Sequence, residues 1–170
     1  GCTDALACNY DASATIDDGS CTYAVAGYDC SGNCLNGGTS TTIDVMEIYP
    51  SGGWTYSLVN YGGTWNLVDQ ATGVSLAGTS DGDNVTLCLP DGCYEISGIS
   101  GSGSSYAFAY SLDGGANITP GVAGATGTGY FTVGAGVCTI NGCTDSLACN
   151  YDAAANTDDG SCTYGGCTDP

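Results

Sequence analysis

The chain has 170 residues and carries 18 acidic side chains but no Lys, Arg or His, which gives a formal net charge of −18. This composition excludes catalysis by an imidazole base or a Schiff-base amine, and it argues against a nucleic-acid partner because no cation is present to neutralise phosphates. Hydrophobic residues make up 42% of the chain, which favours a folded protein over a disordered one.

The twelve cysteines predict disulfides and an extracellular or cell-surface location, because their number is even and no His or Lys is present to activate a thiolate. Zinc is a poorer alternative, since the first three cysteines lack the short paired spacing of structural zinc sites. No stretch reaches the ~20 apolar residues of a membrane span. We expect every cysteine to be paired, although sequence alone does not fix the connectivity. The most economical scheme is Cys2–Cys21, Cys8–Cys30, Cys34–Cys138, Cys88–Cys93, Cys143–Cys162 and Cys149–Cys167.

An internal repeat frames the chain. Residues 1–23 recur as residues 142–164 with 19 of 23 positions identical, and residues 165–170 contain the opening of a third copy. A Cys-containing linker, residues 24–38, follows the first copy. A unit of 23 residues is too small to be held by a hydrophobic core, so it needs disulfides, a bound metal or both.

Oxygen-bearing side chains are concentrated in each repeat. Calcium prefers six to eight oxygen ligands and would relieve the repulsion between the carboxylates. The alternative is that these residues form turns, in which Asp side chains accept hydrogen bonds from nearby backbone amides. The candidate calcium ligands are Asp4, Asn9, Asp11, Asp17, Asp18 and Ser20 in the first copy, and Asp145, Asn150, Asp152, Asp158, Asp159 and Ser161 in the second.

The region between the repeats, residues 39–141, reads as short β-prone runs separated by Gly and Ser. Eight or nine strands with frequent turn signals and no long helical periodicity predict an all-β fold, an antiparallel β-sandwich of jelly-roll type, flanked by the small disulfide-linked repeats. The expected strands are Thr41–Tyr49, Trp54–Asn60, Thr64–Asp69, Val74–Ala77, Asn84–Leu89, Cys93–Ile99, Ser105–Leu112, Tyr130–Val133 and Val137–Ile140.

Three groups in this region offer chemistry. The acidic run 81–84 is either a cation site or, as we favour, a polar loop. Glycoside hydrolysis needs two carboxylates, and Glu47 and Glu95 lie in predicted strands with Asp44 and Asp69, but such acids are more often solvated, so we expect no enzyme activity. The aromatic side chains of Trp54, Tyr56, Tyr61 and Trp65 could stack on sugar rings. The interpretation we favour is core burial, with Trp54, Tyr56 and Leu58 on the inner face of one strand and Trp65 and Leu67 on that of the next.

The repeat motif, Gly-Cys-Thr-Asp-x-x-Ala followed two residues later by Asn-Tyr-Asp and closed by Asp-Asp-Gly-Ser-Cys, resembles a repeat of large secreted proteins of marine bacteria. The run Gly-Tyr-Asp-Cys-x-Gly-Asn-Cys-Leu at 27–35 is similar to the tail that often follows such a repeat, and Cys-Leu-x-x-Gly-Cys-Tyr at 88–94 resembles a motif of a neighbouring β-sandwich. The resemblance implies a secreted, modular and non-catalytic protein.

Three short motifs suggest glycosylation. Asn84 and Asn117 lie in N-glycan sequons, and Ser146 lies in a pattern similar to one used for O-glycans by some bacteria that make such repeats. From all these features we expect one subunit, or one period, of an extracellular filament or surface stalk. Its partner would be the protein itself, joined head to tail or as tandem copies of one long chain. The alternative is a glycan-binding adhesion module.

Overall fold

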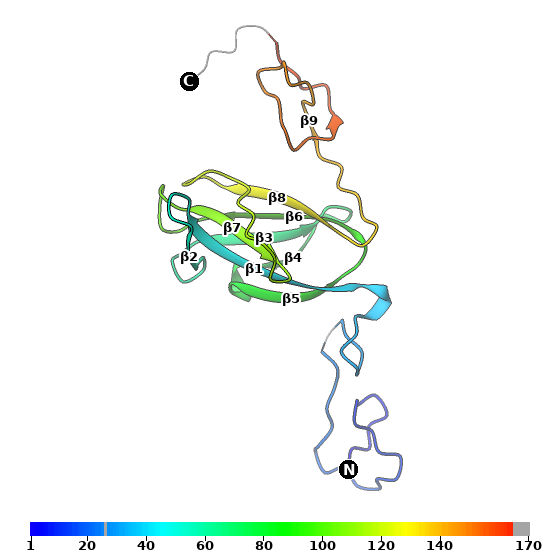
Figure 1. The fold of residues 1–170 in the computed structure, drawn as a ribbon. Coiled ribbons are helices and arrows are strands. Elements are labelled where there is room, and N and C mark those ends of the chain that lie inside the picture. The colour runs from blue at the N-terminus through cyan, green and yellow to red at the C-terminus, as the bar shows by residue number, and fades with distance from the viewer. Residues whose placement is uncertain (26, 165–170) are drawn as a thin grey trace.

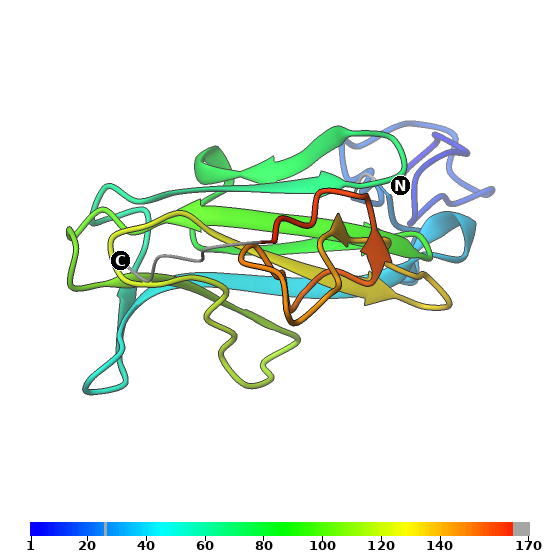
Figure 2. The ribbon, with the colours of Figure 1, turned by 90° about the horizontal axis from the view of Figure 1, so that it is seen from above.

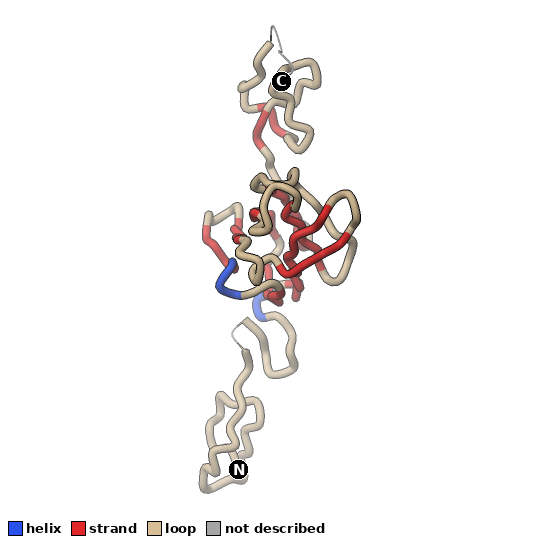
Figure 3. Tube along the Cα trace, turned by 90° about the vertical axis from the view of Figure 1, so that its left-hand side faces the viewer, coloured by secondary structure: helices blue, strands red, loops and turns tan. Residues whose placement is uncertain are grey.

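The computed structural model describes residues 1–25 and 27–164, and its fold is all-β. A central β-sandwich lies between the two repeat units, which project from opposite sides of it (Figures 1 and 3). The units consist almost entirely of loops, whereas the long strands belong to the sandwich. The opening of the third copy, residues 165–170, and with it the predicted Cys149–Cys167 bond, lies outside the described residues.

The first sheet is built around its longest strand, β1 (Thr39–Tyr49). One edge of β1 pairs with β5 (Asn84–Leu89) and, further along, with β2 (Trp54–Ser57), while its other edge pairs with β7 (Ala107–Leu112). All three pairings are antiparallel. Side chains of β1 alternate between buried and partly exposed positions, as expected for a sheet with one face in a core.

The second sheet has the order β4–β3–β6–β8, again antiparallel throughout. Its strands are β3 (Thr64–Asp69), β4 (Val74–Gly78), β6 (Gly92–Ile99) and β8 (Gly127–Val133). Figure 2 shows the strands running side by side along the length of the sandwich. Short 3-10 turns, η1 (Leu35–Gly37) and η2 (Thr79–Asp81), lie before β1 and after β4. No helix among the described residues is long and apolar enough to cross a membrane.

The core lies between the two sheets and contains aliphatic and aromatic side chains from both. Two strand glycines make room for buried aromatic rings: a Cβ on Gly98 would lie 2.5 Å from the Phe108 ring, and one on Gly129 would lie 2.6 Å from the Tyr110 hydroxyl. The buried cluster comprises Ile43, Val45, Leu58, Trp65, Leu67, Ala77, Leu89, Tyr94, Ile96, Phe108, Tyr110, Phe131 and Val133.

Eight of the nine predicted strands are present, with small differences at their ends. The prediction of a strand at Val137–Ile140 is wrong, because this segment leaves the sandwich towards the second unit. Two short strands follow it: β9 (Asn141–Gly142) at the start of the second unit and β10 (Thr157–Asp158) within that unit, and they pair in parallel.

Five disulfides join described residues, and no described cysteine is free. The predicted pairs Cys2–Cys21, Cys8–Cys30 and Cys143–Cys162 are confirmed. The predicted pairs Cys88–Cys93 and Cys34–Cys138 are wrong: Cys34 pairs with Cys88, and Cys93 pairs with Cys138. The reason is topological, since Cys88 on β5 and Cys93 on β6 lie in different sheets rather than in one hairpin. Disulfides of this number are typical of extracellular proteins.

Candidate functional site

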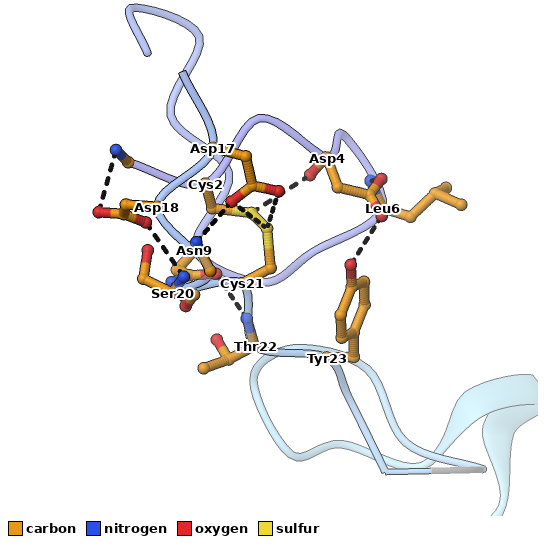
Figure 4. Close-up of a disulfide and its surroundings, with 12 residues drawn as sticks. Cys2, Asp4, Leu6, Asn9, Asp17, Asp18, Ser20, Cys21, Thr22 and Tyr23 are labelled. Atoms are coloured by element: carbon orange, nitrogen blue, oxygen red, sulfur yellow. Dashed lines mark hydrogen bonds and ion pairs between the residues drawn. A yellow bond between two sulfur atoms is a disulfide. The ribbon is translucent and has the colours of Figure 1, made fainter. Parts of the chain in front are cut away.

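The first repeat unit is organised around one disulfide and one asparagine (Figure 4). The Cys2–Cys21 bond has a Cα–Cα distance of 4.8 Å, and Cys2 is buried. Beside it, the Asn9 side chain donates to the carbonyl of Ser20 at 2.6 Å and accepts from the amide of Thr22 at 2.8 Å. The asparagine thus joins the two halves of the loop, next to the backbone hydrogen bond from the Cys8 amide to the Thr22 carbonyl.

The second unit repeats this arrangement. Cys143–Cys162 has the same Cα–Cα distance of 4.8 Å. Asn150 donates to Ser161 at 2.9 Å and accepts from Thr163 at 2.8 Å. Because the two copies form the same contacts at opposite sides of the sandwich, the geometry is a property of the repeat sequence itself.

The aspartates of the first unit cap its turns. Each accepts a hydrogen bond from the backbone amide two residues further on, a local pattern typical of Asx turns. The four bonds are Leu6 to Asp4 at 2.9 Å, Ser13 to Asp11 at 2.8 Å, Gly19 to Asp17 at 2.9 Å and Ser20 to Asp18 at 3.0 Å. The counterparts in the second unit, Asp145, Asp152, Asp158 and Asp159, accept in the same way at 2.9 Å.

The hydrogen bonds to Asp4 and Asp145 lower the pKa of these two carboxyl groups. The amide of Leu6, followed by the Tyr23 hydroxyl, lowers the pKa of Asp4 from 3.8, and Leu147 and Tyr164 do the same for the pKa of Asp145. In return, the bond to Asp4 raises the pKa of Tyr23 above 10.0. The bonds from Tyr23 to Asp4 and from Tyr164 to Asp145 measure 2.8 and 2.7 Å.

All eight aspartates that the sequence predicts as calcium ligands thus form turn contacts. Within the described residues, no group of three or more Asp, Glu, His or Cys side chains is arranged to hold a metal ion. The backbone carbonyls of Ser20 and Ser161 accept from the asparagine side chains, and their backbone amides donate to the aspartates two residues before them. Calcium binding by the units stays a prediction.

The acidic run 81–84 extends from the end of η2 to the start of β5, and its side chains contact neighbouring segments. Asp83 accepts from the Val59 amide at 2.8 Å and from the Ser57 hydroxyl, which ties the end of β2 to the loop before β5. Asp81 accepts from the Gly78 amide at 2.8 Å, and the Asn84 side chain donates to Asp44. The oxygen atoms are thus used in structural contacts.

The predicted glycosylation positions are accessible. Asn84, Asn117 and Ser146 are all exposed, although the Asn84 amide is engaged with Asp44. Whether these residues carry glycans stays a prediction.

The strand carboxylates differ in their surroundings. Glu95 is partly buried and accepts from Gln70 at 2.9 Å, and Asp69 caps the turn after β3. Glu47 is only 1% exposed and lies on the inner face of β1. It accepts hydrogen bonds from the hydroxyls of Ser100, at 2.6 Å, and Ser102. Sequence reasoning expected a solvated acid here and missed this buried one.

The aromatic residues divide into two groups. Trp65 is buried and donates from Nε1 to the carbonyl of Gly82 at 2.9 Å, so the prediction that it belongs to the core is confirmed. For Trp54 and Tyr56 the predicted burial is wrong, since they are 66% and 38% exposed, although they lie on the same face of the sheet as Glu47. They lie on β2, at one end of the sandwich (Figure 1), together with Tyr49 and Tyr106. The four rings line one cavity of about 270 Å³.

No protein-family model, curated protein or solved structure matches this chain. The resemblance to secreted repeat proteins therefore rests on the motifs alone.

Proposed function

We propose that this protein is a structural element of an extracellular filament or surface stalk, and that it transmits tension between its two ends. The observation that carries this proposal is the position of two disulfides, Cys34–Cys88 and Cys93–Cys138. They follow one another along the chain, and only residues 89–92 separate them.

The two bonds create a short covalent path past the sandwich. Tension that enters at Cys34 passes through the first disulfide to Cys88, along residues 89–92 to Cys93, and through the second disulfide to Cys138. Strands β1 to β4 lie wholly inside the loop closed by Cys34–Cys88, and strands β7 and β8 lie wholly inside the loop closed by Cys93–Cys138. The covalent path itself runs along the end of β5 and the start of β6. Extension from the ends therefore cannot unravel either loop.

The arrangement at the ends supports the same role. Cys8–Cys30 joins the first unit to the linker four residues before Cys34, and the Asn156 side chain holds the second unit to the carbonyl of Cys138 at 2.6 Å. The units project from opposite sides of the sandwich (Figure 3), so each is free to meet a neighbour. A head-to-tail contact that does not close into a ring generates an open filament.

Single-molecule extension through the two termini tests the mechanical role. The oxidised protein should show no large gain in length before rupture. Reduction should release two loops with sequence separations of 54 and 45 residues, which corresponds to about 190 and 160 Å at roughly 3.6 Å per residue. A release of this size from the oxidised protein would contradict the proposal.

Assembly needs a separate measurement. Electron micrographs of natively secreted material should show filaments made of this chain. A compact monomer in sedimentation at high concentration, with calcium present, would exclude the filament and leave the glycan-binding alternative.

A further inference from the structure

The aromatic cavity at the end of the sandwich has a defined construction. Antiparallel partners share a face of a sheet, and Trp54 lies opposite Tyr49, while Tyr56 lies opposite Glu47. Tyr106 precedes β7, and its ring centroid lies 5.6 Å from that of Tyr49 and 5.8 Å from that of Tyr56. The rings thus continue the inner face of the first sheet beyond the core.

The backbone is fitted to the rings. A Cβ on Gly52, in the turn between β1 and β2, would lie 2.5 Å from Cδ1 of Trp54 and 3.3 Å from Cδ1 of Tyr49. Only a residue without a side chain lets the indole occupy this position. The amide of Gly124 donates to the carbonyl of Tyr106 at 2.9 Å and so anchors the segment on the other side of the cavity.

A carboxyl group lies one row deeper on the same face. Glu47 is flanked across the sheet by Tyr56 and Phe108, and it is almost completely buried. Its partners are the Ser100 and Ser102 hydroxyls and the Ser102 amide, and the chain has no Lys, Arg or His that could pair with it. Burial of a carboxylate without a nearby cation is costly.

From these features we propose that the cavity binds a small quaternary ammonium group, such as the trimethylammonium end of choline. The negative faces of Trp and Tyr rings attract cations of this kind, and cages of several rings bind them. The net charge of −18 and the carboxyl group of Glu47 favour a cation and disfavour an anion. The volume of about 270 Å³ suits a small headgroup.

A neutral sugar is the main competing ligand, and the lining is poorly suited to it. Sugar binding requires directional partners for several hydroxyls, whereas the cavity is lined by Tyr49, Trp54, Tyr56 and Tyr106 alone. Three phenol groups and one indole N–H provide few such partners. A second copy of this chain has no basic side chain to place in the cavity. The inference is independent of the proposed mechanical role.

Calorimetric titration of the oxidised full chain with choline, at constant ionic strength, tests the site. The matched control ligand is 3,3-dimethyl-1-butanol, which has the shape of choline without its charge. We expect choline to bind at least about tenfold more tightly than this alcohol. Equal binding of the two, no binding of choline, or binding of a neutral oligosaccharide that choline fails to displace would each overturn the proposal.

Variants then locate the site. Tyr106→Leu and Trp54→Leu should each weaken choline binding by about 2- to 30-fold, the range of a single cation–π contact. Tyr106→Phe keeps the ring and should bind choline like the parent chain. Gly52→Ala keeps all four aromatic residues but displaces the indole of Trp54, so it should also weaken binding. Tyr10→Leu, in the first repeat unit, is the remote control. Unchanged affinity in both leucine variants of the cage would overturn the assignment.

Two further experiments test the role of Glu47 and the source of the quaternary ammonium group. Glu47→Gln should weaken choline but not the neutral alcohol, and an equal effect on both ligands would contradict the role given to the carboxyl group. Vesicles of phosphatidylcholine, compared with free choline, distinguish a lipid headgroup from a solute. Binding to either source supports a quaternary ammonium site, and binding to neither overturns it.

Discussion

The ring of Phe108 on β7 lies directly against Gly98 on β6, so that a Cβ at position 98 would approach Cδ2 of the ring to 2.5 Å. The two residues belong to different sheets, and their contact sets how closely the sheets approach each other at this end of the core. The carbonyl of Thr64 would lie only 2.9 Å from the same Cβ, so neither neighbour can easily give way.

Gly98→Ala should therefore destabilise the sandwich by about 1–3 kcal/mol, the usual cost of overpacking a core. Chemical denaturation followed by the fluorescence of the buried Trp65 measures this change. The matched control is Gly92→Ala on the same strand, where the new Cβ would meet only ordinary contacts of 3.5 Å or more. Equal stability of the two variants would show that the Phe108 contact is not limiting.

The Tyr23–Asp4 hydrogen bond predicts a loss of stability in the first unit at both extremes of pH. The pKa of Tyr23 is raised, so the stabilisation is complete below pH 10.0 and is lost as the pH rises through the folded-state value. The pKa of Asp4 is lowered, so its contribution is present above pH 3.8 and is lost as the pH falls through the folded-state value.

Hydrogen-exchange protection of the Cys8 amide, which donates to Thr22 at 2.7 Å, reports the stability of this unit. Tyr23→Phe should lower the protection at neutral pH and abolish its alkaline decrease. Tyr10→Phe removes a hydroxyl from the same unit and should leave the alkaline decrease in place. An alkaline decrease that persists in Tyr23→Phe would argue against this bond as its cause.

Asn156 is predicted to orient the second unit. Its side chain accepts from the Ile140 amide at 2.9 Å and donates to the Cys138 carbonyl at 2.6 Å. The first unit has Thr15 at the equivalent position. Asn156→Thr should increase the mobility of the second unit in NMR relaxation measurements while leaving the melting of the sandwich unchanged. Ala154→Ser, another exchange between the copies, should change neither quantity.

Removal of the Cys34–Cys88 disulfide should lower the free energy of unfolding of the sandwich. The double variant Cys34→Ala/Cys88→Ala opens a loop with a sequence separation of 54 residues, which should cost about 4 kcal/mol of unfolding free energy. The double variant Cys143→Ala/Cys162→Ala opens only the second unit and should leave the unfolding of the sandwich unchanged. Equal losses in the two variants, measured by denaturant unfolding, would be inconsistent with this division.

The sequence was sufficient for features that depend on local pattern. Alternating side chains and turn residues located eight strands, and the repeat itself indicated the bonds Cys2–Cys21 and Cys143–Cys162. The four residues between Cys88 and Cys93 suggested a hairpin, because spacing cannot show that the chain changes sheet between them.

The aromatic cavity was hidden for a related reason. Tyr56 does lie on the inner face of its sheet, as the pattern indicates, but β2 pairs with the part of β1 near Tyr49, at the end of the first sheet where the rings stay exposed. A residue can therefore have the correct face and still be exposed. The burial of Glu47 depends on the serines at 100 and 102, which are distant in sequence.

The Cys8–Cys30 disulfide joins a cysteine of the 23-residue repeat to one beyond its end, so the unit that folds with all its disulfides is longer than the repeat in the sequence. A gene duplication with its boundaries at residues 1 and 23 would copy Cys8 without its partner and leave an unpaired thiol in an oxidising environment. Copies that fold cleanly must therefore bring a cysteine from the flanking sequence with them. Insertion or deletion of such modules should succeed when the boundary falls beyond residue 30 and fail when it falls at the end of the similarity.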